Sequence, residues 1–167
     1  TDNSLVCIPY LPKTVTLLTI DAGKITCFPI HNPDLKVYNA AGEPISIPVN
    51  CAGFIPDANF AKAIRNNCSY CIDACNNLLP PAKDLQSLYL SAYKISDLTG
   101  IEGFPNLQTL NCNNNNLSVI PNLPSKLTSL NCSSNQLKQL PALPETLRYL
   151  ECSGNQLSLL PRLPVTL

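Results

Sequence analysis

Three consecutive blocks of twenty residues repeat one pattern: LQTLNCNNNNLSVIPNLPSK (107–126), LTSLNCSSNQLKQLPALPET (127–146) and LRYLECSGNQLSLLPRLPVT (147–166). Their common unit is L-x-x-L-x-C-x-x-N-x-L-x-x-[LI]-P-x-L-P-x-x. So many positions matching three times at a fixed spacing indicate a repeat architecture, in which stacked coils share one long, narrow core.

The chemistry of the unit predicts the shape of each coil. Leu and Cys at alternate positions are typical of a short strand with one inward face. The Asn three residues after the Cys suits a tight turn, where its amide can bond backbone groups of its own and a neighbouring coil. The paired prolines, such as Pro121 and Pro124, rule out a regular helix on the return path. Because no coil buries its leucines alone, the coils are expected to stack into a parallel ladder.

Weaker copies of the unit lie upstream. One copy, which includes Leu88, precedes the first block by 22 residues, and two degenerate copies place Leu18 and Tyr38 at the same template position. The pattern therefore predicts strands near 17–20, 37–40, 87–90, 109–112, 129–132 and 149–152. The array is expected to be cut at both ends, since the chain starts at Thr1 without Met and stops within a repeat.

These units resemble the leucine-rich repeat family, specifically its short bacterial type with L-P-x-x-L-x-x-L units. The resemblance covers residues 1–48 and 85–167 and implies an α/β-type leucine-rich repeat solenoid, a right-handed parallel β horseshoe with little helix. The strings IPDANFAKAI (55–64) and KISDLTGIEGFPNLQTLNC (94–112) are similar to the cap and first repeat of Bacteroidetes surface proteins. This similarity implies export to the cell surface.

Residues 49–84 interrupt the period and form a predicted Cys-rich, cap-like insertion. A short helix is expected around 57–66, with Asp57 as its N-cap. Four cysteines fall within this joint: Cys51, Cys68, Cys71 and Cys75. Two disulfides are the favoured interpretation, because a loop cannot build its own core. A tetrathiolate zinc site and free or redox-active thiols are the alternatives.

The remaining cysteines are expected to be structural. Cys112, Cys132 and Cys152 occupy an inward template position and should be buried thiols that pack as small hydrophobes. Cys7 and Cys27 share a register one coil apart, so a disulfide between them is sterically conceivable, although two free thiols are the favoured interpretation.

Composition and motifs exclude several classes of function. The chain has 11 basic and 11 acidic residues among 167, a net charge of zero, whereas nucleic-acid binding needs concentrated positive charge. No run of about 18 apolar residues occurs, so no membrane span is expected. His31 is the only histidine, and phosphate-loop, dinucleotide and zinc-protease motifs do not occur. We therefore expect no catalytic residues, no metal and no cofactor.

The outward positions of the strands are the candidate binding surface. They should line one concave face that is polar and nearly uncharged, with a few large side chains of the type that dominates interfaces. The candidate ligand-binding residues are Tyr89, Asn111, Asn131, Arg148, Tyr149 and Glu151. The alternative for most of these positions is an ordinary solvated strand surface.

Together these features predict a non-enzymatic module of a secreted or cell-surface bacterial protein that binds protein or glycan through its concave face. Two alternatives remain open. The first is a substrate-recruiting repeat domain of a bacterial effector enzyme, and the second is a structural accessory subunit of a membrane-associated surface complex.

Overall fold

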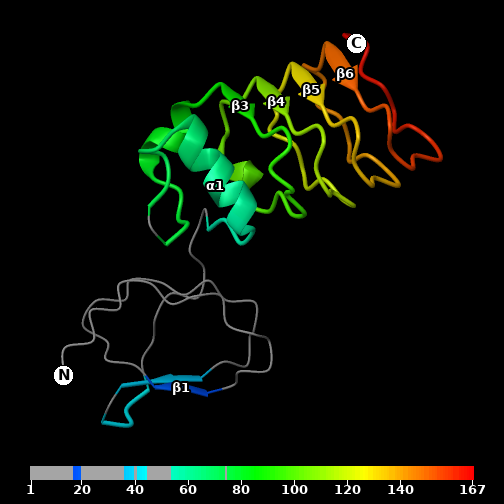
Figure 1. The fold of residues 1–167 in the computed structure, drawn as a ribbon. Helices are drawn as coiled ribbons and strands as arrows, with labels where there is room; N and C mark the ends of the chain where they lie inside the picture. The colour runs from blue at the N-terminus through cyan, green and yellow to red at the C-terminus, as the bar shows by residue number, and fades with distance from the viewer. Residues whose placement is uncertain (1–16, 20–35, 40, 45–53, 74) are drawn as a thin grey trace.

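The computed structural model describes residues 17–19, 36–39, 41–44, 54–73 and 75–167. Its main feature is a four-stranded parallel sheet in the order β3 (Ser87–Tyr89), β4 (Thr109–Asn111), β5 (Ser129–Asn131) and β6 (Tyr149–Glu151). Each strand belongs to one coil, and the coils follow one another along the chain (Figure 1). The predicted parallel ladder is confirmed for these four repeats.

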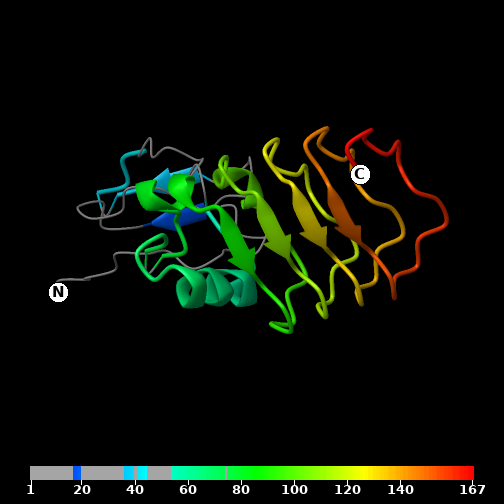
Figure 2. The ribbon, with the colours of Figure 1, turned by 90° about the horizontal axis from the view of Figure 1, so that it is seen from above.

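The register of the sheet follows the repeat spacing. Leu88 of β3 pairs with Leu110 of β4, which pairs with Leu130 of β5 and then Leu150 of β6. The ladder continues just beyond the strands, where the Cys112 N–H donates to the Asn131 carbonyl at 2.8 Å. The four strands therefore lie side by side with their template positions aligned (Figure 2).

The core runs along the inside of the coils. The leucines that begin the three blocks, Leu107, Leu127 and Leu147, are fully buried, and Leu123 and Leu143 in the return segments pack against the core while partly buried. The return segments contain no regular helix over 120–127 or 140–147, as the prolines predict. Apart from α1, the helices in the described part of the chain are two short 3-10 segments, η1 (Pro80–Asp84) and η2 (Ile101–Gly103).

The helix α1 (Ala58–Asn67) lies at the β3 end of the sheet (Figures 1 and 2). Its N-cap is Asp57, whose carboxylate accepts hydrogen bonds from the backbone N–H groups of Asn59 and Phe60. Its apolar side buries Phe60 and Ile64 against the first repeat coil. The predicted helix and its cap are both confirmed.

A separate two-stranded parallel sheet joins β1 (Leu17–Thr19) and β2 (Lys36–Tyr38). Both upstream strands were predicted, but our alignment of the second was wrong by one residue. Leu18 pairs with Val37, not with Tyr38. The degenerate copy offers no repeated Leu at the strand position, so the sequence pattern does not fix the register. The division into 1–48, 49–84 and 85–167 stays a prediction.

Candidate functional site

The candidate site is the outward surface of the four-stranded sheet, which we call the strand face. It consists of two rows of side chains set by the strand register. Ser87, Thr109, Ser129 and Tyr149 form one row, and Tyr89, Asn111, Asn131 and Glu151 form the other. Alternation along each strand separates these residues from the core, since the leucine between them points inward.

The strand face is polar in the middle and aromatic at both ends. Thr109, Asn111, Ser129 and Asn131 on the central strands are half-buried. Tyr89 on the first strand and Tyr149 on the last are 58% and 52% exposed. The two tyrosines therefore offer the largest accessible side chains of this surface.

Four side chains at the β5–β6 end form a hydrogen-bonded chain. The Asn131 Oδ1 accepts from both the backbone N–H and the hydroxyl of Ser133, at 3.0 and 2.7 Å. The Asn131 Nδ2 donates to the Glu151 Oε2 at 2.7 Å, and the Tyr149 hydroxyl donates to the same oxygen at 2.9 Å. Two of the six candidate ligand-binding residues, Asn131 and Tyr149, thus bond directly to a third, Glu151.

The charge of Glu151 shapes this end of the strand face. The hydrogen bond to Glu151, together with its negative charge, raises the pKa of the Tyr149 hydroxyl. Glu151 is the one acidic residue in the two rows, and its carboxylate forms no ion pair within the described residues. Arg148, three residues earlier, is exposed and forms no ion pair with it.

The remaining candidate ligand-binding residues make fewer side-chain hydrogen bonds. The Asn111 Oδ1 accepts from the backbone N–H of Asn113 at 3.2 Å, which holds the side chain against its own strand. Tyr89 and Arg148 extend into solvent at opposite ends of the array. A ligand-binding role for the six residues stays a prediction.

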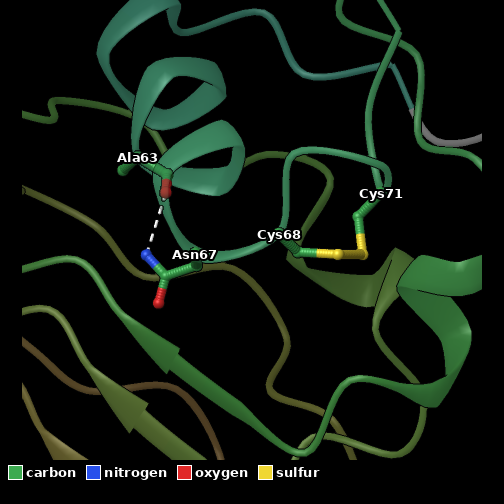
Figure 3. Close-up of a disulfide and its surroundings, with 4 residues drawn as sticks. All are labelled: Ala63, Asn67, Cys68 and Cys71. Atoms are coloured by element: carbon green, nitrogen blue, oxygen red, sulfur yellow. Dashed lines mark hydrogen bonds between the residues drawn. A yellow bond between two sulfur atoms is a disulfide. The ribbon is translucent and has the colours of Figure 1, made fainter.

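The outer edge of the sheet is closed by a side chain that the sequence did not reveal. The Asn67 Nδ2 donates to the Tyr89 carbonyl at 2.9 Å, and the Asn67 Oδ1 accepts from the Tyr89 N–H at 3.0 Å. The amide also donates to the Ala63 carbonyl of its own helix at 2.9 Å (Figure 3). Asn67 therefore replaces a neighbouring strand and fixes the backbone of one strand-face residue.

Asp57 makes a second link between the helix and the repeats. Beyond capping α1, its Oδ2 accepts from the backbone N–H and hydroxyl of Ser96, both at 2.9 Å, and from the Asp97 N–H at 3.1 Å. Partial burial opposes ionisation, but these hydrogen bonds and those from the helix outweigh it and lower the pKa of the Asp57 carboxyl. The cap predicted from sequence is thus also a tertiary contact.

A disulfide joins Cys68 and Cys71 directly after α1 (Figure 3). Cys75 is disulfide-bonded as well, whereas Cys51 lies outside the described residues. No group of three or more metal-ligating side chains occurs among the residues that the structure describes. Pairwise oxidation of all four cysteines in the protein itself stays a prediction.

The cysteine column of the repeats is free and largely buried. Cys112 and Cys132 are fully buried, and Cys152 is half-buried at the last coil. Burial raises the pKa of the Cys112 thiol, and burial together with the neighbouring Cys152 raises the pKa of Cys132 to about 12. The predicted packing role is confirmed for the first two thiols. Cys7 and Cys27, like His31, lie outside the described residues.

The comparison with protein families agrees with this geometry. A model of leucine-rich repeats in two copies matches residues 83–125 and 105–145. Residues 83–145 are leucine-rich repeats. The sheet β3–β6, with one parallel strand per repeat and little helix, is therefore a leucine-rich repeat solenoid, as the sequence predicts.

Solved leucine-rich repeat structures are also similar to the chain. An effector leucine-rich repeat domain from Shigella is 34% identical over 51% of the chain and 38% of its own length, with a TM-score of 0.49. YopM from Yersinia enterocolitica WA-314 is 26% identical over 95% of the chain and 33% of its own length, with a TM-score of 0.43. The chain thus spans about a third of the length of either structure, 38% of the first and 33% of the second. The comparison with curated proteins gave no match.

Within the described residues, α1 is the longest helix, and no helix has the length and apolar character that a membrane crossing needs.

Proposed function

We propose that the chain is a non-enzymatic, protein-binding leucine-rich repeat module whose partner docks on the strand face. The observation that carries this proposal is the alternation of inward and outward side chains along each strand. The inward side chains pack in the core. The outward ones form a continuous polar surface flanked by the exposed rings of Tyr89 and Tyr149.

A protein is the partner that suits this surface best. Tyrosine supplies a large, rigid contact area with few rotamers to freeze, and small Ser, Thr and Asn side chains supply adaptable hydrogen bonds. The parallel ladder and the buried leucines hold these groups in a fixed arrangement, so little ordering is required when a partner binds. A glycan is the alternative occupant.

The non-enzymatic role is supported by the distribution of reactive groups. General acid–base chemistry on a glycosidic bond needs two carboxyl groups facing one another, and the two rows of the strand face contain one, on Glu151. The free thiols of Cys112 and Cys132 are buried and carry raised pKa values, which makes them poor nucleophiles.

We also propose that the parent protein is a secreted or cell-surface bacterial protein, of the Bacteroidetes type that the strings at 55–64 and 94–112 resemble. The clustered cysteines beside α1 support this location, because disulfides persist in oxidising compartments.

Site-specific photo-cross-linking tests the docking surface. A photo-reactive phenylalanine derivative would replace Thr109 or Ser129 on the strand face, and Gln139, exposed in a return segment, in a matched control. In extracts of the source organism, we expect one protein to be cross-linked from both strand-face positions and not from Gln139. Equal cross-linking from Gln139, or binding to a glycan array with no protein captured, would refute a protein partner on this face.

A further inference from the structure

The β5–β6 end of the strand face holds a carboxylate without a cation. Both hydrogen bonds to Glu151 come from neutral donors, Asn131 Nδ2 and Tyr149 Oη, and both reach the same oxygen, Oε2. The other oxygen, Oε1, has no partner within the described part of the chain. One carboxylate oxygen is therefore held in place while the other stays available.

This carboxylate is positioned by groups on two neighbouring coils. Asn131 is itself fixed by two donors of Ser133, so the amide that holds Glu151 cannot rotate freely. Tyr149 holds Glu151 from the same strand and keeps about half of its surface exposed. An anionic acceptor and an accessible aromatic ring consequently stand side by side on a rigid support.

A carboxylate next to an exposed aromatic ring is suited to a guanidinium group. Its N–H groups donate to a carboxylate, and its flat, weakly hydrated cation stacks on a tyrosine face. Arg148 does not fill this role within the chain, because its side chain makes no ion pair with Glu151.

We propose that Glu151 and Tyr149 form a subsite for an arginine side chain of the protein partner. This inference rests on the proposed protein-binding function and specifies the chemistry of one contact. The arginine donates to Glu151 Oε1 and packs on the Tyr149 ring, while Asn131 keeps the carboxylate in place.

Short peptides test the subsite without knowledge of the partner. The probes are acetyl-Gly-Arg-Gly-amide, its lysine counterpart and its citrulline counterpart, which has the same shape without the charge. Amide chemical shifts of the intact chain are followed by NMR during each titration. We expect saturable shifts at residues 149–151 and 131 with the arginine probe, and about five-fold weaker binding of the citrulline probe.

Two variants separate the subsite from general attraction to acidic residues. Glu151→Gln keeps an acceptor for Asn131 and Tyr149 but removes the charge, so it should weaken binding of the arginine probe about five-fold. Glu145→Gln, which removes an exposed carboxylate from a return segment, should change nothing.

Three results would overturn the subsite: no saturable shift up to about 50 mM probe, equal binding of the arginine and citrulline probes, or equal loss in the two variants. Tighter binding of the lysine probe would overturn the assignment to a guanidinium. If a cross-linked partner tolerates Glu151→Gln but is lost with Tyr149→Ala, the subsite is wrong and the docking surface stands. If the probes bind but no partner cross-links from the strand face, the proposed function fails instead.

Discussion

The side-chain amide of Asn67 bonds both main-chain groups of Tyr89, with Nδ2···O and N···Oδ1 distances of 2.9 and 3.0 Å. Among the residues that the structure describes, β3 pairs with one strand, β4, so its other edge would expose unpaired backbone groups. An asparagine amide carries the same donor and acceptor as a peptide group. Asn67 thus ends the sheet in place of another strand and couples α1 to the strand face.

Replacing Asn67 with Ala should lower the free energy of unfolding by about 1–2 kcal/mol, because three hydrogen bonds to backbone groups are lost. Amide hydrogen exchange at Tyr89 should accelerate in the same variant. Asn66→Ala is the matched control, since the Asn66 side chain bonds one exposed hydroxyl, that of Tyr93. Urea unfolding that ranks the two variants equally would contradict the edge-closing role.

The asparagine column, which consists of Asn115, Asn135 and Asn155, should contribute unequally to stability along the array. Asn135 is buried, accepts from the Leu117 N–H and donates to the carbonyls of Cys112 and Cys132. Asn155 makes the equivalent bonds in the last coil but is half-buried. Asn135→Ala should therefore cost about 2–3 kcal/mol and Asn155→Ala less, since water can reach the groups it leaves. Equal losses in chemical denaturation would show that the column is uniformly solvated.

Asp57 should make stability depend on acid pH. Its pKa in the folded chain lies below the ordinary value of 3.8, so its ionised form stabilises the fold above that pH. This contribution is lost as the pH falls through the lowered pKa. The stability advantage of the wild type over Asp57→Asn should be constant above about pH 5 and shrink below pH 3.8. Glu145→Gln, at an exposed position, is the control. An advantage that stays constant down to about pH 2 would contradict the assignment.

The cysteines should separate into two reactivity classes. Alkylation of the native chain without reductant should modify Cys152 first and spare Cys112 and Cys132, because the latter two are buried and have raised pKa values. Cys51, Cys68, Cys71 and Cys75 should be alkylated only after reduction. Cleaving their two disulfides with reductant should add the mass of four hydrogen atoms, and no zinc should be bound. Mass spectrometry that finds these four thiols reactive before reduction, or one zinc per chain, would show that the joint is not disulfide-bonded.

Repetition explains which parts of the structure the sequence could predict. Leu110, Leu130 and Leu150 recur at one spacing, so strand positions, register and burial follow from the pattern. The asparagine column follows too, because each residue occupies the same place in its coil. Tyr38 shows where prediction from the repeat pattern fails. In a degenerate copy no repeated residue fixes the register, and the alignment of this copy with the preceding one was wrong by one residue.

Contacts between unlike elements were not predictable in the same way. Asn67 and Tyr89 are 22 residues apart, on a helix and a strand, with no repeated counterpart to reveal the pairing. The contact between Asn131 and Glu151 could be predicted in part, because 20 residues separate them and they share one register position. Register places such side chains together, but it does not specify which of them form hydrogen bonds.

The most direct test of the proposed function is the affinity of a cross-linked partner for alanine variants at Tyr89, Arg148 and Tyr149. Large rigid side chains dominate surfaces of this kind, so Tyr149→Ala should weaken binding by about 2 kcal/mol or more. The melting temperature should stay nearly unchanged, because the ring is about half exposed. Calorimetric titration that finds the same affinity for all three variants as for the wild type would contradict docking on the strand face.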